Sequence, residues 1–300
     1  MNVANSIKVN LACGGTFIQG ENWINLDFSP TCDAVRKADL LAPLPFATGS
    51  VAIVYSSHFL EHIPRKHVPT FLLECFRILK PGGMIRLVMP DLEEMCREYL
   101  LRREREEHEK ADFVVLEMVD QCVRLRSGGE LGQLYRVYAA DPERNADMIG
   151  YVKIRTGEDL KPVSTVLTDV MGKQTTQTGF PTMENLNLLK KVRFFTDRLW
   201  RRIMNFYFDL LISRLPPTFR EQNISFAGVG ERHHWLWDFH QLKRVLLTAG
   251  FVNIERTEFN KSRVEENVFY MLDADNVGLP RKGAESMYVE ANKHVKAVGP

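Results

Sequence analysis

The chain is 300 residues long, with 45% hydrophobic and 26% charged residues, and this balance is typical of a globular protein with a sizeable core. It excludes a disordered, a collagen-like or a disulfide-stapled protein. Lys and Arg total 39 against 38 Asp and Glu, so the net charge of +1 provides no broad positive field and argues against DNA as a partner. Five scattered cysteines without a Cys-x-x-Cys spacing favour reduced thiols over a disulfide framework or a zinc site.

Asn2, Asn5, Ser6 and Lys8 interrupt the first nine residues where a signal peptide would need an apolar segment. No run of about 18 apolar residues, which a spanning helix would need, occurs anywhere in the sequence. We therefore expect a cytoplasmic protein that is soluble or at most associated with a membrane surface.

The first ninety residues alternate short β-type runs with helical stretches, which is typical of a parallel sheet covered by helices. Apolar positions at helical spacing predict a helix over residues 68–79, which Pro81, Gly82 and Gly83 end. Strands are expected at residues 8–12, 23–27, 35–39, 51–56 and 84–89.

The alternation stops in the middle of the chain. Mixed charges crowd residues 92–110, which predicts a helix with a solvated face. Loops are expected at residues 126–132, 139–147 and 160–181, and the composition of the last of these favours disorder.

A long helix, basic and aromatic, is expected over residues 186–215, ended by Pro216 and Pro217. Such a helix could belong to the core or to a homo-oligomer interface, or could contact an anionic membrane surface. RNA binding is disfavoured because the overall charge is near zero.

The α/β pattern resumes near the C-terminus. A helix is expected over residues 238–249, with Asp238 as its N-cap and Gly250 as its stop. Strands are expected at residues 251–259 and 286–291. One α/β domain is therefore interrupted by a helical insertion.

Glycines and acids follow the expected strands at the positions where open α/β sheets bind nucleotides. Gly14 and Gly15 follow the first strand, allow a positive φ and let a ligand approach the backbone. Asp27 closes the second strand, where a carboxylate can accept hydrogen bonds from both hydroxyls of a ribose. Asp39 closes the third strand, where it can accept an adenine amino proton while Leu40 packs on the ring.

These positions and the motifs around them resemble the ordered motifs of class I S-adenosylmethionine-dependent methyltransferases, most of all the methyltransferase type 11 group. The motifs lie at residues 11–15, 27, 38–40, 44–46, 51–54, 58–63 and 79–83. The resemblance covers residues 8–91 closely and 233–293 loosely. It implies a Rossmann-like, mostly parallel α/β sheet with a large helical insertion. Residues 1–91 and 233–300 would form the S-adenosylmethionine-binding domain, and residues 92–232 a lid or a substrate or interface subdomain.

The resemblance also implies S-adenosyl-L-methionine as cofactor and S-adenosyl-L-homocysteine as product. The cofactor-binding positions it implies are Ala12, Cys13, Gly14, Gly15, Asp27, Phe28, Asp39, Leu40, Ser56 and His58. The chain departs from the family pattern between Gly15 and Trp23, which is too short a segment for a complete crossover helix. A loop or one helical turn is expected there, and a dinucleotide fold is disfavoured because Gly-x-Gly-x-x-Gly is missing.

His58, Glu61 and His62 match His-x-x-Glu-His, the zinc-peptidase signature in inverted order. Here the motif directly follows a strand, and Pro64 ends any helix within about two turns. We therefore expect no metal, and the resemblance places the motif on the loop after the fourth strand, beside the transferable methyl group.

Three residues are candidates for catalysis. His58 is the first candidate for a base, because imidazole titrates near neutral pH, although it could instead order the loop. Asp91, after the fifth strand, could orient a hydroxyl or cap a helix. His234 belongs to a cluster of two histidines and two tryptophans that suits a polyol pocket, although the tryptophans could instead belong to the core.

The resemblance and the histidine-rich site together predict O-methylation of a small-molecule hydroxyl, with a sugar or polysaccharide precursor favoured. Methylation of an amphiphilic or lipid-linked acceptor at a membrane surface is the alternative within enzymes. A non-catalytic cofactor-binding or scaffold protein is the alternative of another class, and the intact acids at Asp27 and Asp39 argue against it.

Overall fold

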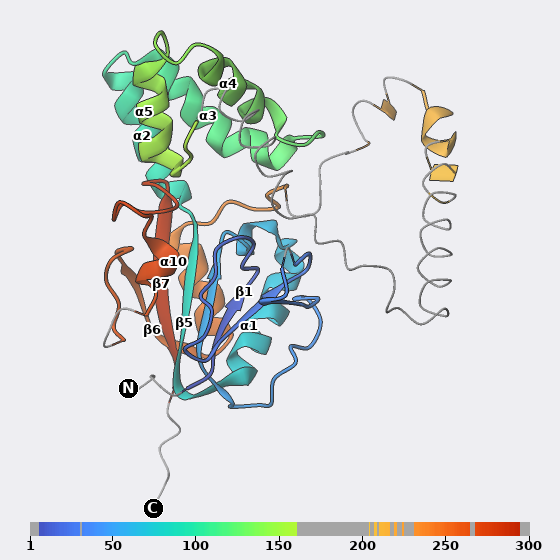
Figure 1. Cartoon of the computed structure of the whole chain (residues 1–300), viewed down its shortest axis with the longest axis vertical. Helices are drawn as coiled ribbons and strands as arrows, with labels where there is room; N and C mark the ends of the chain where they lie inside the picture. The colour runs from blue at the N-terminus through green and yellow to red at the C-terminus, as the bar shows by residue number, and fades with distance from the viewer. Residues whose placement is uncertain are drawn as a thin grey trace, which may run out of the picture.

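The computed structural model describes residues 6–30, 32–160, 231–264 and 268–294, with isolated positions between 204 and 224. Within these residues, seven strands form one sheet in the order β3-β2-β1-β4-β5-β7-β6 (Figure 1). The strands are β1 (Lys8–Leu11), β2 (Trp23–Asp27), β3 (Val35–Lys37), β4 (Val51–Ser57), β5 (Leu79–Pro90), β6 (Phe251–Thr257) and β7 (Ser286–Lys293). Among them β7 runs antiparallel to its neighbours and the other pairs are parallel, which confirms the predicted mostly parallel sheet.

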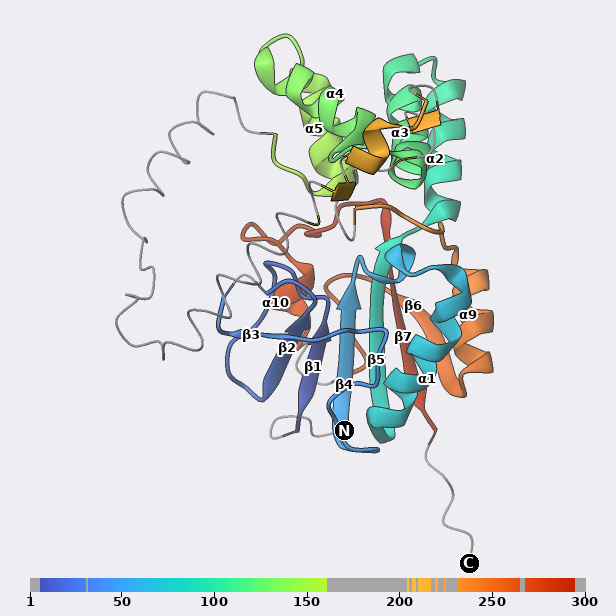
Figure 2. The ribbon, with the colours of Figure 1, turned by 90° about the vertical axis from the view of Figure 1, so that its right-hand side faces the viewer.

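Helices α1 (Val68–Ile78) and α9 (Phe239–Thr248) lie on the same side of the sheet (Figure 2). Their apolar faces share one core with β1, β4 and β5. A second core on the other face contains the short helix α10 (Tyr270–Asp273) and Ile18 from the first crossover. Burial on both faces explains why β4 reads as a nearly continuous apolar run.

The first crossover, residues 12–22, contains no helix, as its length predicted. Two buried asparagine side chains hold it in place. Asn10 donates to the carbonyl oxygen of Thr16 at 3.0 Å, and Asn25 donates to that of Ile18 at 3.0 Å. The loop therefore receives from two strands the hydrogen bonds that a helix would supply internally.

A layer of helices lies beyond the carboxyl ends of the parallel strands (Figures 1 and 2). It consists of α2 (Leu92–Glu104), α3 (His108–Val123), α4 (Gly129–Ala140) and α5 (Ala146–Thr156), which bury a core of their own. The loop predicted at residues 126–132 is partly wrong, because α4 begins at Gly129. Gly128 and Gly129 both have positive φ and form the turn into that helix.

Arg155 joins this helical layer to the sheet. Its guanidinium is 2% exposed and pairs with Glu94 of α2 at 2.6 Å and Glu117 of α3 at 2.9 Å. Its carbonyl oxygen accepts the backbone N–H of Glu285, just before β7, at 3.0 Å. A Cβ at Gly283 would lie 2.1 Å from that same carbonyl oxygen, so the two segments touch backbone to backbone.

The C-terminal predictions are confirmed. Asp238 caps α9 by accepting the backbone N–H of Gln241 at 2.7 Å, and Gly250 has φ 94° after the helix ends. Residues 161–181 and most of the long helix expected at residues 186–215 lie outside the described residues. Among the described helices, none combines the length and the apolar character needed to cross a membrane.

Candidate functional site

A first cavity of about 400 Å³ opens at the carboxyl ends of β1, β2 and β4. The described residues that line it are Ala12, Asp27, Phe28, Ser29, Asp39, Leu40, Leu41, His58, Phe59, His62 and Ile63. Ala12 and His58 both have positive φ, 55° and 50°, which is uncommon for residues other than glycine and marks functional sites. The chain therefore bends sharply at both positions where it enters the cavity wall.

Asp27 and the glycine turn form one unit. The Asp27 carboxylate accepts the backbone N–H of Gly14 at 2.9 Å and that of Ser29 at 2.8 Å. Because a carboxylate has about four acceptor positions, lone pairs remain for the two hydroxyls of a ribose. A Cβ at Gly14 or Gly15 would meet nothing within 4 Å, so the backbone borders open space in which a ligand fits.

Asp39, Leu40 and Phe28, three of the predicted cofactor residues, line the same cavity. Asp39 accepts the backbone N–H of Leu41 at 3.0 Å, which leaves its second oxygen for an amino group. Leu40 is buried beside it, whereas Phe28 is 51% exposed and offers an uncovered aromatic face. An acceptor beside apolar and aromatic surface fits a purine base.

Four of the expected cofactor residues, Cys13, Gly14, Gly15 and Ser56, are not among the residues that line the first cavity. Ser56 is buried, and its hydroxyl donates to the carbonyl oxygen of Leu11 at 3.1 Å. The Cys13 side chain is buried, and burial raises the pKa of its thiol to about 12. Both residues support the neighbouring strand ends.

The family comparison now decides the identity of this sheet. Residues 19–87 match the family model Methyltransf_11, described as a methyltransferase domain. The sheet has the class I methyltransferase fold, and residues 19–87 carry the similarity to the family. The strand order with an antiparallel β7 is that of this class, and its cofactor is S-adenosylmethionine. No curated protein matches the sequence.

Solved structures that resemble the chain include several methyltransferases. An S-adenosylmethionine-dependent methyltransferase from Mesorhizobium loti is 19% identical and has a TM-score of 0.24, and the matched region covers 32% of this chain and 50% of that protein's chain. A putative methyltransferase in complex with the Haloferax volcanii Trm112 activator is 20% identical, with coverages of 37% and 61% and a TM-score of 0.25. A methyltransferase from Archaeoglobus fulgidus is 12% identical, with coverages of 97% and 88% and a TM-score of 0.36. The chain thus spans half to three fifths of the first two structures, and such distant likenesses carry no argument about its acceptor.

A second cavity of about 440 Å³ lies between the methyltransferase sheet and the helical layer. Its described lining is His58, His62, Gln121, Arg124, Gly128, Leu131, Gly132, Tyr135, Thr156, Glu158, Glu231, His233, Lys282 and Glu285. His58 and His62 line both cavities. The two cavities therefore meet at the loop after β4, and the second one has walls from α3, α4 and the end of α5.

The protonation pattern of His58 follows from its hydrogen bonds. Its Nε2 lies 2.9 Å from the Ser286 hydroxyl, and that hydroxyl donates its single proton to the carbonyl oxygen of Lys282 at 3.0 Å. Nε2 must therefore carry the proton of the neutral ring and donate to Ser286. The Nδ1 lone pair then faces Oε1 of Glu61 at 3.4 Å.

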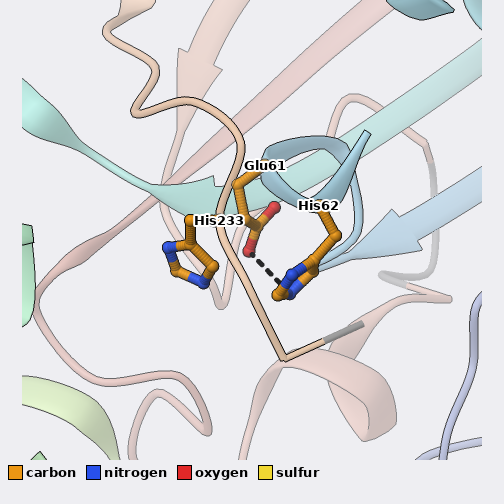
Figure 3. Close-up of side chains that lie close together, drawn as sticks. All are labelled: Glu61, His62 and His233. Atoms are coloured by element: carbon orange, nitrogen blue, oxygen red, sulfur yellow. Dashed lines mark ion pairs between the residues drawn. The ribbon is translucent and has the colours of Figure 1, made fainter. Parts of the chain in front are cut away.

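His62 has the opposite tautomer. Its Nδ1 lies 2.9 Å from the carbonyl oxygen of Arg232 and must donate to it. The lone pair on Nε2 then faces Oε1 of Glu61 at 4.0 Å, and the ring meets that of His233 edge to face at 4.7 Å. In Figure 3 the Glu61 carboxylate lies between the two imidazole rings.

Burial governs the charges in this cluster. It raises the pKa of Glu61 to about 8 and lowers the pKa of His233 to about 3. Burial also lowers the pKa of His62 and holds that of His58 well below its usual value, with Lys282 adding to both effects. The imidazoles are therefore neutral at pH 7 and present lone pairs.

The structure places the other two catalytic candidates away from both cavities. Asp91 is 2% exposed, caps α2 by accepting the N–H of Glu93 at 3.1 Å, and pairs with Arg256 at 2.9 Å. The His234 side chain is exposed, and its backbone N–H donates to the carbonyl oxygen of Glu61 at 2.7 Å. Neither lines a described cavity, whereas the preceding residue, His233, does.

Sequence reasoning did not single out His233, Arg124 or Lys282 as site residues. In the sequence His233 stands out only as one of two adjacent histidines. The β-bridge between Asp91 and Trp237 helps to set which of the two side chains faces inward. Arg124 and Lys282 carry no motif, because they come from a helix end and a loop 158 residues further along the chain.

Proposed function

We propose that this protein transfers a methyl group from S-adenosylmethionine to a hydroxyl of a small polar acceptor, with a sugar or polysaccharide precursor as the favoured class. The observation that carries the proposal is the meeting of the two cavities at His58 and His62. A cofactor held by Asp27 and Asp39 would extend toward this junction, and an acceptor in the second cavity would reach it from the other side.

When bound, the cofactor would supply a methyl carbon that takes an electron pair from the acceptor oxygen while the carbon–sulfur pair returns to sulfur, leaving S-adenosylhomocysteine. The protein's own task is to align the two molecules, exclude water and receive the hydroxyl proton. His58 remains the base candidate that borders both molecules, and neutral His62 and His233 offer further acceptor atoms. Asp91 and His234 would have structural roles and no part in the reaction.

The lining of the second cavity favours a hydroxyl-rich acceptor over a lipid. Arg124 and Lys282 are donors, and Glu158, Glu231 and Glu285 are acceptors. Of the described residues that line this cavity, Leu131 alone is aliphatic. The alternation of donors and acceptors suits the hydroxyl groups of a saccharide.

The proposal assigns residues 1–91 and 233–300 to the cofactor-binding domain and residues 92–232 to a subdomain that covers the acceptor. The helices α2–α5 bury an apolar core that is separate from the two cores of the sheet, which supports this division. A cytoplasmic location also belongs to the proposal, on composition alone.

Calorimetric titration with S-adenosylmethionine and S-adenosylhomocysteine tests the cofactor site. Wild type should bind both, and Asp27→Ala should bind at least about tenfold more weakly, since about 1.5–3 kcal/mol is typical of hydrogen bonds to a charged group. Asp33→Ala is the matched control, because Asp33 lies six residues further on and lines neither cavity. Equal affinity of a folded Asp27→Ala protein would remove Asp27 from the site.

Transfer of a radiolabelled methyl group to a panel of monosaccharides, nucleotide sugars and lipid-linked sugars tests the acceptor. Labelling of soluble sugars supports the proposal. Labelling confined to lipid-linked acceptors, together with sedimentation with anionic liposomes, would favour the membrane-surface alternative, for which Tyr207, Phe208 and Leu211 are exposed. Cofactor binding without transfer to any acceptor would favour a non-catalytic protein.

A further inference from the structure

The Glu61 carboxylate is buried without a donor. Its side chain is 1% exposed, and neither Oε1 nor Oε2 has a hydrogen-bond partner within the described residues. Nδ1 of His233 is likewise buried without a partner there. Buried carboxylates normally accept several hydrogen bonds or bind a cation, because an unpaired one is costly.

Lone pairs of two imidazole nitrogens face the Glu61 carboxylate, where hydrogen-bond donors would be expected. The hydrogen bonds to Ser286 and Arg232 force the lone pairs of His58 Nδ1 and His62 Nε2 to face the same carboxylate oxygen. One ligand atom from each of Glu61, His62 and His233 lies within 4.8 Å of the others (Figure 3). Because acceptors that face one another repel, a positively charged species is expected between them.

We propose that Glu61, His62 and His233 bind a divalent transition-metal ion, such as Zn²⁺ or Mn²⁺, at the junction of the two cavities. Two imidazoles and one carboxylate are a ligand set that these ions prefer, and this set leaves coordination positions open. The carbonyl oxygen of Arg232 orients His62 in the way that outer carbonyls orient metal-binding histidines.

This site differs from the one the His-x-x-Glu-His motif suggests. In the peptidase arrangement both histidines lie on one face of a long helix. Here the motif forms the single turn η1 (Leu60–His62), which presents Glu61 and His62 together, and the third ligand comes from residue 233. The expectation of a metal-free loop rested on the missing helix, and the tertiary structure supplies the missing ligand instead.

The ion would act on the acceptor, and this part of the inference rests on the proposed function. His62 and His233 both line the second cavity, so open coordination positions would face the acceptor. A hydroxyl bound there would lose its proton more readily, because a divalent ion lowers the pKa of bound oxygen. The site would therefore select acceptors that present an oxygen, preferably two neighbouring hydroxyls that chelate the ion.

Metal binding is measured on protein stripped with EDTA and desalted, with no cofactor present. Calorimetric titrations with MnCl₂ and ZnCl₂ are compared for wild type, Glu61→Gln, His233→Gln and the control His67→Gln. Gln at position 61 keeps the size and can donate to His58 Nδ1, and His67 is an exposed histidine on the neighbouring turn η2 (Arg65–His67). Circular dichroism and S-adenosylmethionine titration verify the fold of each variant.

We expect wild type and His67→Gln to bind about one equivalent of at least one of the two ions, and the two ligand variants to bind it about tenfold or more weakly. Equal affinity in all four proteins, or no saturable binding by folded wild type, would overturn the inference and leave a protonated Glu61 that donates to His58. Metal binding without S-adenosylmethionine binding would instead contradict the proposed function and leave the metal site standing. Binding of both, with methyl transfer unaffected by EDTA, would remove the role in the acceptor reaction.

Discussion

Replacement of Arg155 by Met should separate acceptor chemistry from cofactor binding. The side chain links α2, α3 and α5 through its ion pairs with Glu94 and Glu117. Met fills much of the same volume but leaves both carboxylates without their cation. The walls of the second cavity depend on this layer, whereas the first cavity is built from the sheet.

The loss in free energy of unfolding follows from how deeply Glu94 and Glu117 are buried. Glu117 is 0% exposed and would lose two donors, from Nε at 3.2 Å and Nη2 at 2.9 Å, whereas Glu94 is 32% exposed and can be rehydrated. Breaking a buried pair typically costs 3–5 kcal/mol. Burial raises the pKa of Glu117 to about 7 even beside Arg155, so in the variant it takes up a proton at little further cost. We therefore expect about 3 kcal/mol, the lower end of that range.

Arg102→Met is the matched control. Arg102 also makes two ion pairs in the same helical layer, with Glu98 at 2.7 Å and Glu107 at 2.6 Å, but its side chain and both partners are partly exposed. Pairs near water contribute about 1 kcal/mol or less.

Urea unfolding followed by circular dichroism gives the stabilities, and calorimetry gives the affinity for S-adenosylmethionine. The expected result is a loss of about 3 kcal/mol and of methyl transfer in Arg155→Met, with cofactor affinity within about twofold of wild type. Equal destabilisation in the two variants would refute the argument from burial. A parallel loss of cofactor binding would refute the division into two subdomains.

Three further outcomes are expected. Asp39→Ala should weaken S-adenosylmethionine binding about five- to fiftyfold in calorimetry, because it removes the proposed adenine acceptor and the hydrogen bond to the following turn. Arg86→Met should lower the free energy of unfolding by about 4–5 kcal/mol, because it leaves Asp273 and Glu290 buried and unpaired. Burial already raises the pKa of Asp273 to about 6, so the loss should be smallest near pH 4, where that carboxyl is protonated in the folded state of both wild type and variant, and should grow toward pH 7 in urea titrations. At pH 8, mass spectrometry should find Cys13 alkylated by iodoacetamide at least about a hundredfold more slowly than the exposed cysteines, because burial raises its thiol pKa to about 12.

The sequence by itself determined the sheet and the cofactor side of the site. Strand periodicity, the glycine turn and an acid at the end of each of two strands are local signals, and parallel strands necessarily bring their carboxyl ends to one edge. Asp27, Asp39 and Leu40 could therefore be placed at one edge of the sheet before any contact was known. The missing crossover helix was also predictable, because chain length alone forbids it.

Only the tertiary structure decided which residues line the second cavity. His58, His233 and Lys282 meet although more than two hundred residues separate the first from the last, and no periodic pattern records such a meeting. Sequence could not choose between His233 and His234, since adjacent residues face opposite ways and the docking of this segment on Glu61 sets which one is buried. Asp91 shows the converse. Its position after β5 suggested a catalytic role, but in the structure it caps α2 and forms an ion pair with Arg256, which β6 brings close.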